Sequence, residues 1–349
     1  MMQTIYSDVK QFRGSHYDFG YQQGLDLKQT YILQNRKKQW NIRQPRFDIH
    51  ETEVKRIVQP IAPGIWDELC GLMDALQWQM VDILKEFGGY RLEYKKSGCS
   101  IFTSSDYMIR NYDYHPKTYE CRYMVFQPND QGYATVAPSQ RITGRMDGMN
   151  EHGLAIGYNF IHRRRPKDGF ICNMIARIIL ENCKNAQEAI ALLQEIPHRH
   201  SFSYVLLDKN GESYIVEASP RSVYIRTDQV CTNHFENLVE ENRHHLKDSK
   251  RRQQTIQEET NATTSAYEAF KLMNDSKRGV FSTKYKQWAG TIHTSGYFPK
   301  QLKAWFALGG DRDPVIFDFK KWLSGKNFTI KQVIGKVDTS LPFIHMERI

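Results

Sequence analysis

The stretch YKKSGCSIFTSSDYMIRNYDYHP, residues 94–116, decides the architecture that we expect for this chain. Runs of β-branched and aromatic residues flank a turn at residues 104–106, which is typical of a β-hairpin. Antiparallel pairing about this turn brings Cys99 opposite residues 110–113. A thiol, the guanidinium of Arg110 and the carboxylate of Asp113 then share one end of the hairpin. Because a neighbouring arginine favours the thiolate, the pattern predicts a nucleophilic Cys99.

Gly98 directly precedes this cysteine. A residue without Cβ adopts backbone geometries forbidden to others and lets a side chain approach its carbonyl closely. The thiol of Cys99 could therefore attack the Gly98 carbonyl in an N-to-S acyl shift, and hydrolysis would leave Cys99 as a new N-terminus. The released α-amino group, with an ordinary pKa of about 7.7 to 8.0, would then serve as general base. The simpler interpretations are a buried thiol at Cys99 and a surface or interstrand ion pair for Arg110 and for Asp113.

The predicted secondary structure changes at Cys99. Before it, the sequence predicts helix at about 16–42 and a helix of six turns over 65–87, where apolar residues recur at helical spacing. After it, short strand-like runs alternate with turn signals, and helical stretches are expected at 170–182, 186–195, 249–259 and 264–274. Strands resume at about 290–297 and 302–307. This order indicates an α+β fold in which helices cover antiparallel sheets.

The composition limits the number of domains, the kinds of site and the location that we expect. The chain has 349 residues, 40% of them hydrophobic, which suits one main domain with an appended segment. Its six cysteines show no CxxC spacing, so neither a zinc site nor a disulfide framework is expected. There is no apolar stretch long enough to cross a membrane, so a cytoplasmic location is the default expectation. The formal charge of +9 suits an anionic ligand, a nucleic acid or a membrane surface equally well.

Five blocks together resemble the N-terminal-nucleophile (Ntn) hydrolases of the choloylglycine hydrolase and acyl-CoA:6-aminopenicillanic acid acyltransferase group, the C45 peptidases. The blocks are RGSHYDFGYQQG (13–24), SGCSIF (97–102), IRNYDY (109–114), MDGMNEHGLAIGYNF (146–160) and CTNHF (231–235). The first is similar to the opening of acyltransferase-like precursors, and the second to their Gly-Cys processing site. Their occurrence in one order is far more specific than any single block.

The resemblance implies roles for individual residues around Cys99. Arg110 and Asp113 match the active-site arginine and aspartate of the family. Asn159 matches an oxyanion-hole asparagine, and Asn233 matches a second catalytic asparagine, both suited to stabilising an oxyanion. A further family arginine follows a serine at a helix start.

The block DSKRRQQ (248–254) offers two candidates for that last arginine. We favour Arg252, with Arg251 next. The simpler interpretation of both is an exposed, charged helix start.

The resemblance also implies a whole architecture. We expect a four-layer αββα sandwich of two antiparallel sheets, with residues 1–98 as a mainly helical pro-segment and 99–349 as the catalytic domain. Cleavage between Gly98 and Cys99 would make the pro-segment a small subunit. The implied substrate is a small linear N-acyl amide or an acyl thioester, attacked through an acyl-enzyme on Cys99. No metal, organic cofactor, nucleic acid or membrane is implied, and a homo-oligomer is left open.

Two other classes of function stay open at this point. A chain with this fold could bind a polyanion without catalysis, through its basic surface. Alternatively, Cys99 could pair with one of His115, His152, His162 or His234 in a cysteine protease that is not processed at Gly98.

Overall fold

The computed structural model describes residues 1–43, 49–92, 98–161, 165–242, 246–261 and 263–346. Among the candidate residues, only His162 lies outside these ranges. The described helices are α1 (His16–Lys28), α2 (Ile32–Arg43), α3 (Glu51–Ile61), α4 (Pro63–Leu76), α5 (Met80–Phe87), α6 (Cys172–Asn182), α7 (Ala186–Glu195), α8 (Lys247–Glu259), α9 (Ala266–Asn274) and α10 (Phe319–Leu323). Short 3-10 turns occupy Pro116–Thr118, Val239–Glu241 and Tyr285–Gln287.

Two sheets form the centre of the molecule. The larger has ten strands, ordered β11-β10-β9-β8-β7-β5-β4-β1-β17, with β6 paired to β5. These strands are β1 (Met2–Gly14), β4 (Arg122–Pro128), β5 (Thr135–Gln140), β6 (Gly144–Arg145), β7 (Gly148–Asn150), β8 (Ala155–Phe160), β9 (Phe202–Leu207), β10 (Ser213–Ala218), β11 (Val223–Arg226) and β17 (Gln332–Asp338). The smaller sheet has seven strands, ordered β12-β2-β3-β14-β15-β16, with β13 paired to β14. They are β2 (Ser100–Thr103), β3 (Met108–Tyr114), β12 (Val230–Cys231), β13 (Thr283–Lys284), β14 (Ala289–Phe298), β15 (Lys303–Leu308) and β16 (Val315–Asp318).

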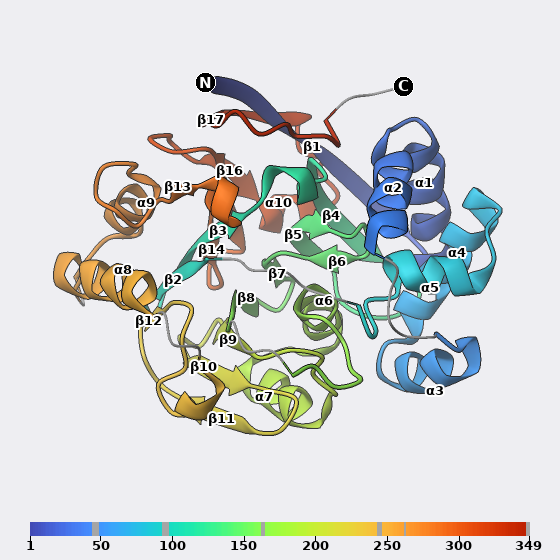
Figure 1. Cartoon of the computed structure of the whole chain (residues 1–349), viewed down its shortest axis with the longest axis horizontal. Coiled ribbons are helices and arrows are strands. Elements are labelled where there is room, and N and C mark those ends of the chain that lie inside the picture. Colours follow the sequence, from blue (N-terminus) through green and yellow to red (C-terminus); the bar gives the residue numbers. More distant parts are fainter. Residues whose placement is uncertain (44–48, 93–97, 162–164, 243–245, 262, 347–349) are drawn as a thin grey trace.

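Helices cover the outer faces of both sheets. Helix α6 packs on β5 to β8 and α7 packs on β9 to β11, whereas α8 contacts β2 and β12, and α9 contacts β3 and β14. Figure 1 shows α8 and α9 on one side of the strands and α6 and α7 on the other. The layers therefore run helix, sheet, sheet, helix, and the expected αββα sandwich is confirmed.

The first 98 residues contain a strand that the helical spacing did not predict. Residues 2–14 form β1, which lies between β17 and β4 in the large sheet. The pair with β17 is antiparallel, but the pair with β4 is parallel, with Asp8 opposite Arg122. The large sheet is thus antiparallel apart from this pair, and the first 98 residues supply one of its inner strands.

The remaining N-terminal residues form the helical cluster that the spacing indicated. Helices α1 and α4 pack closely because glycines line the contact: a Cβ at Gly20 would lie 2.0 Å from the Glu68 carbonyl oxygen. The expected single helix over 65–87 is divided into α4 and α5. Gln77 ends α4 in the left-handed conformation, with φ of 57°, and its N–H donates to the carbonyls of Met73 and Asp74.

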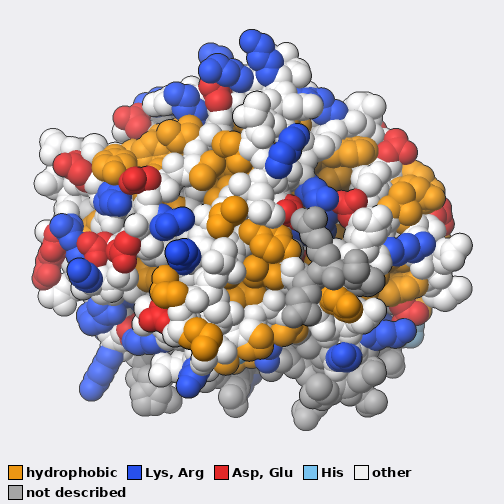
Figure 2. Space-filling view, turned by 90° about the horizontal axis from the view of Figure 1, so that it is seen from above, with side chains coloured by type: hydrophobic (Ala, Val, Ile, Leu, Met, Phe, Trp, Pro, Cys, Tyr) orange, Lys and Arg blue, Asp and Glu red, His pale blue; other side chains and the backbone are white. Residues whose placement is uncertain are grey.

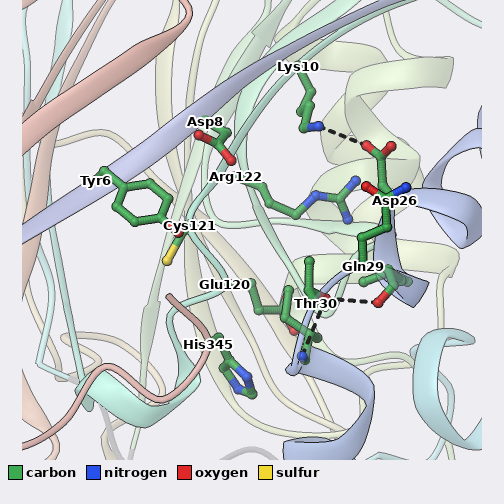
Figure 3. A pocket seen from close by; sticks show the side chains of 12 residues that line it. Tyr6, Asp8, Lys10, Asp26, Gln29, Thr30, Glu120, Cys121, Arg122 and His345 are labelled. Carbon is green, nitrogen blue, oxygen red and sulfur yellow. Dashed lines mark hydrogen bonds and ion pairs between the residues drawn. The ribbon is translucent and has the colours of Figure 1, made fainter. Parts of the chain in front are cut away.

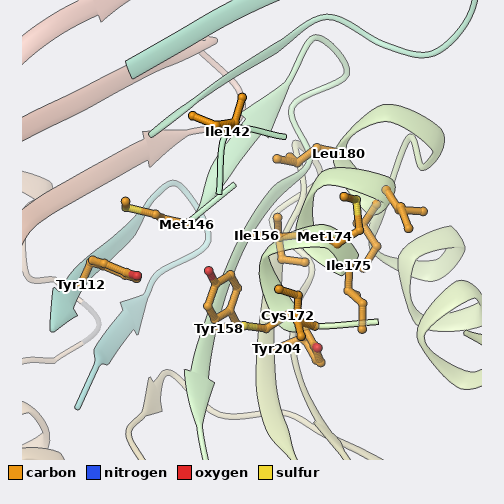
Figure 4. Close-up of a cluster of buried hydrophobic side chains, with 14 of the residues drawn as sticks. Tyr112, Ile142, Met146, Ile156, Tyr158, Cys172, Met174, Ile175, Leu180 and Tyr204 are labelled. Atoms are coloured by element: carbon orange, nitrogen blue, oxygen red, sulfur yellow. The ribbon is translucent and has the colours of Figure 1, made fainter. Parts of the chain in front are cut away.

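A hydrophobic core fills the space between α6 and the sheets. Figure 4 shows Met174, Ile175 and Leu180 of α6 directed towards Ile156 of β8, while Tyr158 lies towards Tyr112 of the small sheet. All six side chains are almost fully buried. This packing fixes β8 against the hairpin β2–β3, and Cys99 directly precedes that hairpin. None of the described helices has the length and apolarity needed to cross a bilayer.

Candidate active site

The predicted hairpin positions Cys99. Strands β2 and β3 pair antiparallel, with Ser100 opposite Asn111 and Ile101 opposite Arg110. Cys99 comes directly before β2, so it lies beside the end of β3 that carries Asp113. Its side chain is only 1% exposed in the continuous chain.

Three groups surround the Cys99 thiol. Nη2 of Arg110 lies 3.5 Å from Sγ, the backbone N–H of Asp113 donates to Sγ at 3.5 Å, and the Asp113 carbonyl oxygen lies 3.9 Å away. Burial nevertheless raises the pKa of the Cys99 thiol, although the charges of Arg110 and Arg252 oppose this effect. In the continuous chain the arginines therefore limit the cost of forming a thiolate without removing it.

Arg110 is held from several sides within the sandwich. Nη1 donates to Oδ2 of Asp147 at 2.6 Å, and Nη2 also donates to the carbonyl oxygen of Tyr158. The rings of Tyr112 and Tyr158 lie 5.0 and 4.9 Å from the guanidinium carbon. Burial lowers the pKa of Arg110, but the neighbouring Cys99 and Asp147 outweigh it and the net shift is upward. Arg110 thus remains a fixed cation beside the thiol.

The carboxyl group of Asp113 lies close to Gly98. Its Oδ1 accepts a hydrogen bond of 2.6 Å from Thr291, whereas Oδ2 is buried and accepts none from the described residues. Burial raises the pKa of Asp113 to about 7, although Arg252, Thr291 and Arg110 act in the opposite direction. Oδ2 of Asp113 is therefore a buried hydrogen-bond acceptor beside the Gly98–Cys99 bond, the predicted cleavage site.

Little room is left for a side chain at Gly98. A Cβ at this position would lie 3.0 Å from Cβ of Ala289 and 3.7 Å from Oδ2 of Asp113. Any larger residue would crowd β14 beside the Asp113 carboxyl.

The two arginines at the start of α8 have different surroundings. Arg252 is 3% exposed, and its Nη1 donates to the Cys99 carbonyl oxygen at 2.8 Å and to Ser100 Oγ at 2.6 Å. Its Nη2 donates to Oδ1 of Asn233 at 2.9 Å. Arg251 is half-exposed and pairs with Asp248 on the same helix. The structure therefore places Arg252, the favoured candidate, among the site residues.

The two asparagines join this cluster to different degrees. Nδ2 of Asn233 donates to the carbonyl oxygen of Phe160 at 3.0 Å, so Asn233 connects Arg252 with the end of β8. Nδ2 of Asn159 donates to the carbonyl oxygen of Cys231 at 2.9 Å, and its Oδ1 is buried without a partner among the described residues. Asn159 therefore reaches the cluster through the backbone of β12, which pairs with β2.

Sequence reasoning did not single out three residues of this site. Asp147, Tyr158 and Thr291 contact Arg110 or Asp113 directly. Asp147 and Tyr158 belong to the block MDGMNEHGLAIGYNF. The available signal was the charge of Asp147, because charged residues are rarely buried without a partner. Thr291 offered no such signal, because the pairing of β14 with β3 is long-range.

The alternative histidines have other partners. His115 accepts from the Lys117 backbone, His152 lies edge-on to Tyr133, and Nδ1 of His234 lies 2.9 Å from Ser249 Oγ. Within the described ranges, none of these three is hydrogen-bonded to Cys99 Sγ. The same ranges contain no group of three or more His, Cys, Asp or Glu side chains arranged to hold a metal ion.

The face shown in Figure 2 and the cavity beside β1 do not favour a polyanion site. On the face in Figure 2, Lys and Arg side chains are scattered among acidic and apolar ones. A cavity of about 110 Å³ lies away from Cys99, between β1, the end of α1 and the start of β4. Figure 3 shows that its lining mixes Lys10 and Arg122 with Asp8, Asp26 and Glu120. This mixture of charges does not select an anion.

The comparisons with solved structures return an acylase, a bile acid hydrolase and an acid amidase, all at low sequence identity. Penicillin V acylase from Agrobacterium tumefaciens shares 16% identity, with 64% of this chain and 86% of that chain covered and a TM-score of 0.46. A mutant of conjugated bile acid hydrolase from Clostridium perfringens shares 12% identity. The match covers 70% of this chain and 97% of that chain, with a TM-score of 0.39. The Caenorhabditis elegans orthologue of N-acylethanolamine-hydrolyzing acid amidase shares 12% identity. The match covers 58% of this chain and 93% of that chain, with a TM-score of 0.41.

The family comparison is more direct. No match was found among curated proteins. Residues 102–313, more than half of the chain, match the family described as Acyl-coenzyme A:6-aminopenicillanic acid acyl-transferase. The match includes most of the hairpin β2–β3, the strand β8 and the helix α8 that surround Cys99. The chain therefore belongs to the acyl-coenzyme A:6-aminopenicillanic acid acyl-transferase family, and so to the Ntn-type amide hydrolases and acyltransferases.

Proposed function

We propose that this chain is an autoprocessed cysteine Ntn enzyme that cleaves a linear N-acyl amide or an acyl thioester through an acyl-enzyme on Cys99. The observation that carries the proposal is the grouping of Arg110, Asp113 and Arg252 around Cys99 and the Gly98–Cys99 bond. A structural cysteine needs no such surroundings, because buried thiols are ordinarily packed among apolar side chains.

Maturation is the first chemical step of the proposal. The Cys99 thiol loses its proton and attacks the carbonyl carbon of Gly98, and the C–N bond then breaks as the leaving amine of Cys99 takes up a proton. Water hydrolyses the resulting thioester, which yields a carboxylate on Gly98 and a free thiol on Cys99. Arg110 favours the thiolate, and Gly98 has no side chain beside the carbonyl that the thiolate attacks.

Turnover uses the new N-terminus. The α-amino group of Cys99 accepts the thiol proton, the thiolate attacks the acyl carbonyl, and the protonated amine donates its proton to the leaving group. Oδ2 of Asp113 is suited to accept a hydrogen bond from that amine, since it lies beside Gly98 and has no partner among the described residues. Water then releases the acyl group in a hydrolase, and an amine accepts it in a transferase.

The asparagines and Arg252 complete the proposed site. Asn159 and Asn233 each carry a side-chain amide that can donate to the developing oxyanion. Arg252 holds Asn233 and the Cys99 carbonyl in one arrangement through its two Nη atoms. The substrate is a small molecule, and the charge of +9 favours an anionic one. The pro-segment, residues 1–98, stays bound as a second subunit.

Intact-mass analysis and N-terminal sequencing of freshly expressed protein test this proposal. We expect a fragment ending at Gly98 and a larger one beginning CSIFTSS, which separate only under denaturing conditions. Cys99→Ala should abolish the cut because it removes the nucleophile, and Cys70→Ala is the matched control that removes a remote thiol. A wild-type chain that stays intact and is fully active would refute autoprocessing, because Cys99 would have no free α-amine.

A further inference from the structure

A single carboxylate links the two sheets behind Arg110. Asp147 lies between β6 and β7 of the large sheet and is completely buried. Its Oδ2 accepts from Arg110 Nη1 at 2.6 Å and lies 3.2 Å from His293 Nε2. Its Oδ1 accepts from Ser295 Oγ at 2.9 Å and from the Tyr297 hydroxyl. All four partners belong to β3 and β14 of the small sheet, so Asp147 is anchored across the layer that contains Cys99.

The charge state of this group is fixed. Burial raises the pKa of the Asp147 carboxyl, but His293, Arg110 and Tyr297 outweigh it and the net shift is downward. Burial lowers the pKa of His293, although Asp147 opposes this. At neutral pH the cluster therefore contains one carboxylate, a neutral imidazole and the guanidinium of Arg110.

Both Nη atoms of Arg110 have partners in the site. Nη1 is taken by Asp147, while Nη2 donates to the Tyr158 carbonyl oxygen and faces Cys99 Sγ. A Cβ at Gly157 would lie 2.8 Å from Cδ of Arg110, so the glycine in β8 makes room for this side chain. Without the Asp147 carboxylate, Nη1 would lose its ionic partner inside the sandwich.

We infer that Asp147 is a positioning residue, which holds Arg110 against the thiol of Cys99 and thereby sets the reactivity of that thiol. The inference rests on the proposed function for its consequence in catalysis, but the contact with Arg110 is independent of it. Asp147 touches neither Cys99 nor the Gly98 carbonyl, and it acts through the guanidinium alone.

The sign of the effect separates positioning from simple electrostatics. A carboxylate near a thiol disfavours the thiolate, so Asp147→Asn with Arg110 unmoved would make Cys99 ionise at lower pH. If Asp147 positions Arg110, the same substitution lets the cation leave Sγ, and Cys99 ionises at higher pH. The two accounts predict opposite shifts.

The experiment follows the rate of Cys99 alkylation by iodoacetamide from pH 6 to 10. Mass-spectrometric mapping distinguishes the uncut chain from the processed protein, and wild type and variants are compared within the same form. Asp147→Asn should move the profile to higher pH by about one unit, which slows alkylation about tenfold at pH 7.5. The rate of Gly98–Cys99 cleavage should fall in parallel. Glu68→Gln is the matched control, because Glu68 is an equally buried carboxylate paired with Arg177 at 2.7 Å and remote from Cys99. It should leave the profile in place.

A double-mutant cycle with Arg110→Lys tests whether the effect passes through Arg110. Asp147→Asn should add less than a twofold change in the Arg110→Lys background. A shift to lower pH, an unchanged profile, or full additivity of the two substitutions would overturn the inference. If Asp147→Asn does not fold, Tyr297→Phe removes one donor to the carboxylate, and an unchanged Cys99 profile in that variant would overturn it equally. Wild-type protein that neither cleaves nor turns over would refute the proposed function, while the alkylation profiles would still decide the role of Asp147.

Discussion

Asp113→Asn should stabilise the unprocessed chain at high pH and should block its processing. Burial raises the pKa of Asp113 from 3.8 to about 7. Because the folded pKa lies above the unfolded one, the folded chain retains a proton that the unfolded chain has released. The contribution of Asp113 to the free energy of unfolding therefore falls as the pH rises from about 4 to 7. The full cost of the buried carboxylate is about 4 kcal/mol above pH 7 and roughly 1 to 2 kcal/mol at pH 5.

An asparagine at this position keeps the hydrogen bond from Thr291 and carries no charge. It also places an unsatisfied amide where Oδ2 lies, at a cost that does not depend on pH. The stability difference between Cys99→Ala/Asp113→Asn and Cys99→Ala alone should therefore grow by roughly 2 to 3 kcal/mol from pH 5 to pH 8. Urea unfolding followed by tryptophan fluorescence measures it, and the Cys99→Ala background keeps both chains uncut.

The result that would refute this reasoning is a stability difference that stays constant, or shrinks, between pH 5 and pH 8. It would mean that Arg252 and Arg110 hold Asp113 ionised in the folded chain despite its burial. Processing gives a second readout, because Asp113→Asn with Cys99 intact should cleave slowly or not at all.

Three further predictions concern the other site residues. Arg252→Met should lower turnover at least 100-fold because it frees Asn233 and the Cys99 carbonyl, whereas Arg251→Met, which removes a half-exposed side chain, should stay within about twofold in the same steady-state assay. Asn159→Ala and Asn233→Ala should each reduce turnover about 100- to 1,000-fold with unchanged circular dichroism, and near-normal turnover in both would contradict their oxyanion role. Thiol alkylation of processed protein, mapped by mass spectrometry, should be concentrated at Cys99, and preferential labelling of another cysteine would contradict the nucleophile assignment.

Local patterns in the sequence were sufficient for the elements around Cys99. The turn at residues 104–106 set the register of β2 and β3, and the helices expected at 170–182 and 186–195 lie within two residues of α6 and α7. The choice between the two arginines was also within reach. Ser249, Arg252 and Ile256 recur at helical spacing and are the buried residues of α8.

Long-range pairing was not accessible from local patterns. β1 alternates apolar and polar residues only weakly, and its partners β4 and β17 lie more than 100 and 300 residues away. The same limit applies to Asp147, because its four partners lie at position 110 and at positions 293–297. A sequence read in windows of ten to eighteen residues cannot bring such groups together.

The position of β1 also bears on what a cut after Gly98 would do. β1 hydrogen-bonds along its length to β4 and β17, both of which belong to the larger fragment. Glu68 of α4 pairs inside the molecule with Arg177 of α6, and both side chains are fully buried. Separating the fragments would expose two strand edges and leave an uncompensated charge on each side, which is far more costly than breaking a surface contact. Cleavage in this fold would therefore free an N-terminus at Cys99 while the large sheet still holds the pro-segment.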